Sequence, residues 1–251
     1  MKREDFEIEV CANSITSSIA ADKGGADRVE LCDSLYEGGT TPSAGMISQV
    51  KNSTSLQIFP MIRPRGGDFF YSKEEINVMI KDIEIARNFG ADGFVIGCLN
   101  IDGSIDYENC SRLIEAAKGL PITFHRAFDM VADPYQALSV CNKLGVKRIL
   151  TSGQKDKAID GVSLISELVQ LAGDKVIIMV GSGVTEFNIT DIANITKAKS
   201  YHVSLRKSYN SKMEFRRSDI FMGGLSEIPE FENKFTSTEK VKMLISNLEK
   251  I

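Results

Sequence analysis

Two short stretches of the sequence, FEIEVC (6–11) and DRVELC (27–32), end in the same Glu-x-Cys pattern. Apolar and polar residues alternate along both stretches, and this alternation predicts two β-strands. Each strand then carries hydrocarbon on one face and carboxylates with a thiol on the other. Carboxylates can transfer protons, and thiolates are soft ligands that suit Cu(I). The residues of these strands that could do chemistry are Glu9, Cys11, Glu30 and Cys32.

Strand-like apolar runs recur along the chain, and helical patterns such as 76–89 and 164–171 separate most of them. The runs are FEIEVC, DRVELC, LQIFPMI, GFVIGCL, PITFHRA, KRILTSG, KVIIMVG and SYHVSL. About eight βα units in a chain of this length predict an α/β fold, the (β/α)8 TIM barrel. A doubly wound open sheet is the alternative, but no G-x-G-x-x-G motif follows the first strand. We predict one domain spanning 1–251, with a long polar insertion over 207–235 before the last helix.

In such a barrel the hydrocarbon face of each strand packs on the outer helices, and the opposite face points inward. The two Glu-x-Cys patterns then lie inside, at the carboxyl ends of their strands, where active sites of this fold are found. Buried carboxylates are costly without partners. The alternation in QIFPMIRPR predicts that Arg63 and Arg65 point inward and supply those partners.

The same alternation places both histidines of the chain, His125 and His202, at inward positions near strand ends. A single inward histidine is by default a satisfied core residue. Two of them beside inward carboxylates favour a site instead. The candidate acid–base residues are Glu9, Glu30, His125 and His202.

A GSG turn at 181–183 follows the seventh predicted strand and precedes a predicted helix over 185–195. Barrels often bind phosphate at this place through backbone N–H groups and a helix N-terminus. Guanidinium groups could also hold a phosphate or a carboxylate. The candidate anion-binding residues are Arg63, Arg65, Ser182, Gly183 and Arg206. The alternative is that the arginines only neutralise the inward glutamates.

Cys11 and Cys32 form a pair on neighbouring strands. Strands lie about 4.8 Å apart and barrel shear staggers them by about 3.3 Å, which puts the two Cα atoms about 6 Å apart. Two thiolates at that distance suit Cu(I), and a disulfide is also geometrically possible. The chain has five cysteines, an odd number, and no C-x-x-C motif. These features favour free thiols in a reduced, cytoplasmic protein.

The net charge of -4 and the pI near 5.4 give no indication of a nucleic-acid partner. No apolar run approaches the roughly 20 residues that a membrane span requires. The start of the sequence, MKREDFEIEV, enters a strand at once and lacks the apolar core of a signal peptide. We therefore expect neither a membrane nor a nucleic acid as partner.

Many phrases of the sequence, in order, closely resemble the CutC family of copper homeostasis proteins. They are EVC, GGADRVELCDSLYEGGTTPSAG, MIRPRGGDFFYS, DGFVIGCL, ITFHRAFDM, RILTSG and YHVSLR. The resemblance runs from about residue 6 to residue 206. It implies a cytoplasmic (β/α)8 barrel that forms a homodimer or homotetramer, with a role in copper tolerance and Cu(I) binding. The cysteines proposed as ligands in animal members fall on Cys11 and Cys32.

Two hypotheses from different classes remain open at this point. In the first, the protein binds Cu(I) through Cys11 and Cys32. In the second, it is an isomerase, lyase or hydrolase for a small anionic metabolite, and the cysteines are incidental. The inward carboxylates and histidines are more numerous than two thiolates need, which is the argument for the second hypothesis.

Overall fold

The computed structural model describes residues 1–217, 219–222 and 228–251. Eight parallel strands form one sheet in the order β3-β2-β1-β8-β7-β6-β5-β4. The strands are β1 (Glu7–Ala12), β2 (Arg28–Leu31), β3 (Gln57–Pro60), β4 (Phe94–Ile96), β5 (Ile122–Phe124), β6 (Arg148–Thr151), β7 (Ile177–Val180) and β8 (Ser200–Val203).

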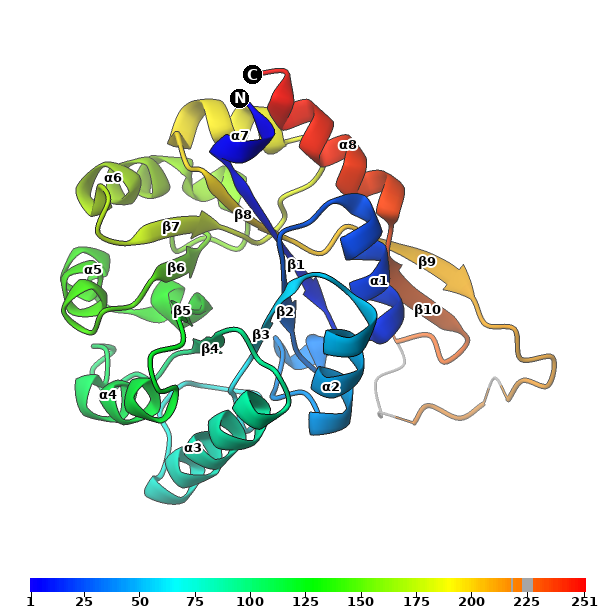
Figure 1. Ribbon diagram of the computed structural model, residues 1–251, viewed down its shortest axis with the longest axis horizontal. Coiled ribbons are helices and arrows are strands. Elements are labelled where there is room, and N and C mark those ends of the chain that lie inside the picture. The colour runs from blue at the N-terminus through cyan, green and yellow to red at the C-terminus, as the bar shows by residue number, and fades with distance from the viewer. Residues whose placement is uncertain (218, 223–227) are drawn as a thin grey trace.

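The α-helices of the described chain alternate with these strands and form a ring around them (Figure 1). They are α1 (Ile15–Gly24), α2 (Ala44–Ser53), α3 (Lys73–Asn88), α4 (Tyr107–Ala116), α5 (Pro134–Lys143), α6 (Val162–Ala172), α7 (Ile189–Thr196) and α8 (Thr238–Glu249). Six begin at a side chain that accepts a hydrogen bond from a backbone N–H of the first turn, which satisfies a donor that the helix itself cannot. The capping residues are Ser14, Ser43, Ser72, Asp106, Asp133 and Ser237.

The two ends of the sheet meet between β3 and β4, and this contact closes the barrel. Met61 and Val95 form a parallel bridge there, and the N–H of Ile62 donates to the Val95 carbonyl at 2.8 Å. Nearer the amino ends of the two strands, the N–H of Asp92 donates to the carbonyl of Ile58 at 2.8 Å. The predicted (β/α)8 barrel is confirmed.

The strand alternation predicted from the sequence also holds. Ile8 and Val10 of β1 belong to the hydrophobic core between strands and helices. Helix α3 contributes Ile76, Met79 and Ile83, which are buried on one face. Since hydrocarbon fills the space outside the strands, the polar faces of β1 and β2 point into the barrel.

The insertion over 207–235 contains a two-stranded antiparallel ribbon, β9 (Arg206–Asn210) and β10 (Glu232–Thr236). The ribbon projects beyond the helix ring in Figure 1. It is attached to α1, because the N–H of Thr236 donates to Ser17 Oγ at 3.1 Å. The parts of the predicted insertion at 218 and 223–227 lie outside the described residues.

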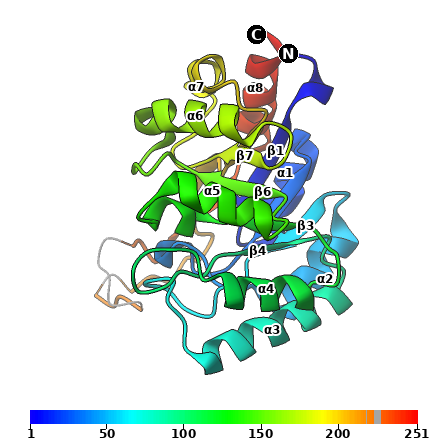
Figure 2. The same cartoon turned by 90° about the vertical axis from the view of Figure 1, so that its left-hand side faces the viewer.

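The two chain termini lie side by side in both views of the molecule (Figure 2). The terminal amino group of Met1 donates to the carbonyl of Leu248 at 3.2 Å, which joins the start of the chain to α8. In the described part of the chain, no helix has the length and apolar character needed to cross a bilayer.

Candidate functional site

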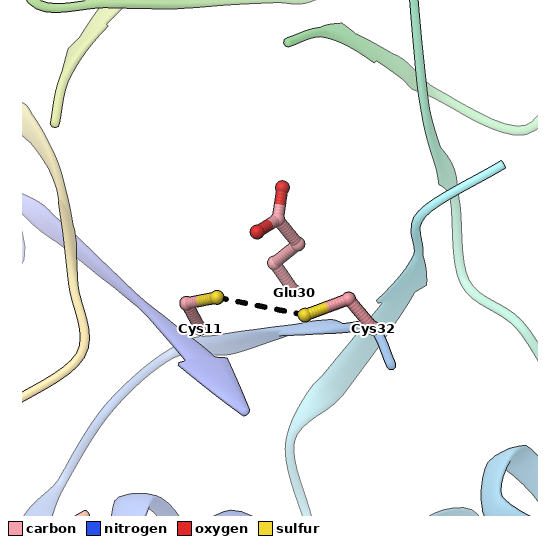
Figure 3. Close-up of side chains that lie close together, drawn as sticks. All are labelled: Cys11, Glu30 and Cys32. Atoms are coloured by element: carbon pink, nitrogen blue, oxygen red, sulfur yellow. Dashed lines mark hydrogen bonds between the residues drawn. The ribbon is translucent and has the colours of Figure 1, made fainter. Parts of the chain in front are cut away.

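Cys11 and Cys32 face each other at the carboxyl ends of β1 and β2 (Figure 3). The register pairs Cys11 with Glu30, and the N–H of Cys32 donates to the Ala12 carbonyl at 3.0 Å, which continues the pairing beyond β2. The two Sγ atoms are 3.6 Å apart. The predicted closeness of the two cysteines is confirmed. All five cysteines lie in the described part of the chain, and all are free thiols.

The donor atoms of Cys11, Glu30 and Cys32 all lie within 4.8 Å of one another. With metal–sulfur bonds of about 2.3 Å, a linear two-sulfur site would hold its sulfurs about 4.6 Å apart. The Sγ–Sγ separation of 3.6 Å is shorter, so the pair fits a bent site with a third donor. Glu30 is close enough to be a third donor, and its Oε1 is buried with no hydrogen-bond partner among the described residues. The residues present therefore fit a soft metal ion.

Glu9, His202 and Glu30 form a chain of polar groups beside the cysteines. His202 Nδ1 lies 2.8 Å from Glu9 Oε1, and its Nε2 lies 3.5 Å from Glu30 Oε2. The register explains this contact, because Glu9 of β1 is paired with His202 of β8. Burial by itself would lower the pKa of His202, but Glu30 and Glu9 raise it well above 6.5. Glu30, and after it Cys11 and Glu9, thus favour the charged form of the imidazole.

The two carboxyl groups of this chain have opposite pKa shifts. Burial would raise the pKa of Glu9, but Arg28 and His202 outweigh burial and lower it to about 2. Glu30 has no guanidinium partner among the described residues, and burial raises its pKa well above the usual 4.5. Two carboxyl groups whose pKa values are pushed apart are typical of an acid–base pair.

The partner of Glu9 is Arg28, and the prediction that Arg63 or Arg65 would neutralise the inward glutamates is wrong. Arg28 Nε donates to Glu9 Oε2 at 2.5 Å, and both side chains are buried. Arg28 also contacts Glu7, which in turn accepts from Arg148 Nε at 3.1 Å. The error has a simple cause, since β3 ends at Pro60 and strand alternation does not extend to residues 63 and 65.

Arg63 lies in the wall of the barrel mouth and is buried, and it has no carboxylate partner among the described residues. Its Nη1 donates to the carbonyls of Glu37 and Gly39 at 2.7 and 2.8 Å, and its Nη2 donates to the carbonyl of Gly67 at 2.7 Å. Its Nε is buried and has no acceptor in the described chain. Arg63 thus joins the loops after β2 and β3 and keeps a free N–H edge.

Arg65 lies on the surface, outside the barrel mouth. Its Nε donates to Glu75 at 2.5 Å and its Nη2 to Asp68 at 3.1 Å, and 39% of its side chain is exposed. The structure therefore does not bring Arg65 together with the other predicted anion-binding residues.

His125 follows β5 and is 3% exposed. The N–H of Ala127 donates to its Nδ1 at 3.1 Å, so the ring proton resides on Nε2. This Nε2 is buried and has no partner in the described residues. Burial and the charge of Arg63 lower the pKa of His125 to about 3, which keeps the ring neutral.

The GSG turn lies at the barrel mouth, but no helix follows it directly. The predicted helix over 185–195 begins only at Ile189, because Asn188 Oδ1 accepts from the N–H of Thr185 and holds an irregular turn. Ser182 and Gly183 still line the mouth, and Arg206 lines it from the start of β9. Ser182 has a left-handed φ of 75°, and its Oγ donates to the Asp156 carbonyl.

A cavity of about 470 Å³ occupies the barrel mouth. The predicted site residues that line it are Cys11, Glu30, Arg63, His125, Ser182, Gly183, His202 and Arg206. Sequence reasoning missed the lining residues Phe69, Glu186 and Lys240. Lys240 Nζ lies 3.5 Å from Glu186. Both side chains come from segments outside the strands, where strand alternation carries no signal.

Comparisons with known proteins relate most of this chain to CutC proteins. The model of the CutC family matches residues 6–207. The human copper homeostasis protein cutC homolog is 46% identical over 95% of this chain and 88% of its own. A family protein CutC from Parabacteroides distasonis is 50% identical over 95% of this chain and 98% of its own.

Solved structures show the same relationship. The crystal structure of CutC from Streptococcus agalactiae superposes with a TM-score of 0.76 at 37% identity, over 79% of this chain and 98% of that one. An N-(5'-phosphoribosyl)anthranilate isomerase from Pyrococcus furiosus superposes with a TM-score of 0.58 at 11% identity, which is a likeness of fold alone. By family model, sequence identity and structure, this chain belongs to the CutC family.

Proposed function

We propose that this protein binds Cu(I) as a cargo ion, through the thiolates of Cys11 and Cys32 with the Glu30 carboxylate as third donor, in a copper homeostasis role. The observation that carries the proposal is the 3.6 Å separation of two thiols that face each other beside a buried carboxylate oxygen without a partner in the described chain. Thiolates select soft ions such as Cu(I), and a hard ion such as Mg²⁺ would require oxygen donors. The copper homeostasis names of the family relatives support the same ion.

We infer a cytoplasmic location for this site, since a reducing compartment would keep two thiols 3.6 Å apart free to bind the ion. The Cys32 thiol and burial raise the pKa of the Cys11 thiol well above 9.0. Cys11 is therefore protonated at neutral pH, and burial favours the protonated form of Glu30 as well, so binding of the ion must displace these protons. We expect the Cu(I) affinity to increase about tenfold per pH unit for each thiol proton released.

The test is an anaerobic competition titration of the purified protein against a chromophoric Cu(I) chelator. We expect about one Cu(I) per chain in the parent and at least a hundredfold weaker binding in the Cys11→Ser/Cys32→Ser variant. Cys141→Ser is the matched control, because Cys141 is a buried thiol of α5 outside the barrel mouth. A double variant that titrates like the parent would exclude the thiolate site.

A further inference from the structure

We propose that the barrel mouth also binds a small organic carboxylate, held by the guanidinium of Arg63 and the Nε2–H of His125. This site uses none of the proposed copper ligands. It accounts for two buried polar groups, Arg63 Nε and His125 Nε2, that have no hydrogen-bond partner in the described part of the chain. Such groups are uncommon in folded proteins, because each one forfeits a hydrogen bond that water would have supplied.

Arg63 is organised before any ligand arrives. Carbonyls of Glu37, Gly39 and Gly67 accept three of its five N–H donors. These bonds fix the plane of the guanidinium and leave Nε–H and one further N–H unused by the described chain. A guanidinium with two unused donors can donate to the oxygens of a carboxylate.

The charge of Arg63 is also uncompensated. Its side chain is buried, and within the described residues every partner of the guanidinium is a neutral carbonyl. A neutral acceptor satisfies a hydrogen bond but does not balance a buried charge, which is costly to desolvate.

The other charged groups of the cavity wall have partners of their own. Arg126 is paired with Asp129 at 2.7 Å, Lys240 with Glu186 at 3.5 Å, and His202 with Glu9 at 2.8 Å. Arg206 lies at the half-exposed rim, where water screens it. Arg63 is thus the buried cationic side chain of this wall that has no carboxylate partner among the described residues, and a carboxylate ligand would supply one.

His125 lines the same cavity and carries a second unpartnered donor. The Ala127 N–H occupies Nδ1, so Nε2 carries a proton and can only donate. Gly97 makes room for the ring, because a Cβ at that position would lie 2.4 Å from His125 Cε1. Phe69 connects the two groups, since its ring centroid lies 5.0 Å from the His125 ring and 5.0 Å from Arg63 Cζ.

The size and lining of the cavity favour an organic anion over a bare inorganic ion. A volume of about 470 Å³ is within the range of metabolite pockets, about 300–1,000 Å³. Leu35, Met61 and Leu150 give the wall an apolar portion that can contact carbon atoms. A few fixed polar groups in an apolar wall are the usual construction of a small-molecule site.

A purely structural role for Arg63, as a clamp between two loops, is the competing account. Both accounts predict that removal of Arg63 lowers stability. Only the carboxylate site predicts a ligand-dependent gain in melting temperature that depends on both Arg63 and His125, and the experiment measures that gain.

The experiment is a thermal-shift titration of the full chain with lactate, pyruvate, malate and succinate at constant ionic strength, with inorganic phosphate and chloride as comparison anions. A carboxylate at about ten times its Kd should raise Tm by about 3–5 °C. Arg63→Lys keeps the charge but loses the planar edge, and we expect at least a tenfold weaker Kd. Arg65→Lys is the matched control outside the cavity and should bind like the parent.

If Arg63→Lys does not fold, His125→Phe decides the question, because it keeps a ring and removes the Nε2–H donor, together with the Nδ1 acceptor of the Ala127 N–H. We expect about a tenfold loss of carboxylate affinity in that variant. The proposal is overturned if no carboxylate raises Tm, if phosphate alone does so, or if the shift survives in both His125→Phe and Arg63→Lys. The two proposals fail separately: Cys11→Ser/Cys32→Ser should retain carboxylate binding, and Arg63→Lys should retain Cu(I) binding.

Discussion

The barrel interior contains two buried arginines in contrasting surroundings. Arg28 contacts the carboxylates of Glu9 and Glu7. Together with Arg148 and Phe59 these residues form what we call the lower layer of the barrel. Arg63, at the mouth, contacts carbonyl oxygens. In the lower layer each guanidinium has a carboxylate partner, although Arg148 Nη1 has no hydrogen-bond partner in the described chain. At the mouth, the Arg63 charge has no carboxylate partner, and the N–H donors of Arg63 Nε and His125 Nε2 have no acceptor in the described chain. Free donors of this kind are what a ligand would bind.

Cation–π contacts also stabilise the lower layer, in addition to its ion pairs. The guanidinium carbons of Arg28 and Arg148 lie 5.0 and 5.6 Å from the centroid of the Phe59 ring, which contacts both cations. Arg148 donates to both oxygens of Glu7 through Nε and Nη2. The paired charges and the Phe59 ring fill this part of the barrel. We therefore propose that the lower layer stabilises the fold and that the mouth binds ligands.

The largest expected loss of stability comes from removing the ion pair between Arg28 and Glu9 in the lower layer. Arg28→Met leaves Glu9, which is fully buried, without its guanidinium. We expect a loss of about 3–5 kcal/mol in the free energy of unfolding, measured by urea denaturation. A loss below about 1 kcal/mol would mean that water reaches Glu9. The ion pairs of the lower layer would then not stabilise the fold, which contradicts the proposed difference from the mouth.

A second effect follows from the pKa of Glu9, about 2 against an ordinary 4.5. A carboxyl group whose pKa is lower in the folded state stabilises the fold above pH 4.5, and this stabilisation is lost as the pH falls toward 2. The shift corresponds to about 3 kcal/mol.

Glu9→Gln isolates this contribution from other acid-sensitive groups. The stability difference between parent and variant, from urea denaturation at a series of pH values, should be full near pH 6 and should shrink below about pH 4.5. A difference that stays constant from pH 6 to pH 3 would show that Glu9 titrates normally.

The smallest effect should come from Arg65, which the sequence alternation places in the site and the structure places on the surface. Its pairs with Glu75 and Asp68 are screened by water, so Arg65→Ala should change the unfolding free energy by less than about 1 kcal/mol. Isothermal titration should give unchanged affinities for Cu(I) and for carboxylates. A loss of either affinity would place Arg65 in the mouth after all.

The sequence was informative wherever a local rule determined the geometry. The βα repeat predicted the barrel, and strand alternation with inter-strand spacing predicted that Cys11 and Cys32 lie close together. Both follow from backbone geometry that is the same in every parallel sheet.

The pairing of charges was not predictable in the same way. Alternation placed Arg28 on the inner face, but its choice of Glu9 depends on the register between two strands. Arg63 was predicted to neutralise a glutamate, whereas the chain leaves β3 before that residue and carries its guanidinium to backbone carbonyls. Lys240 reaches the cavity from α8, whose position depends on the whole fold.

We propose that Cu(I) binds where Cys11 and Cys32 meet beside Glu30. The most direct measurement is an anomalous difference map at the copper edge, from crystals of the protein grown anaerobically with Cu(I). The account predicts one peak within about 2.3 Å of both Sγ atoms. A peak at Cys98 and Cys110, which are neighbouring buried thiols, or no peak at the barrel mouth, would contradict it.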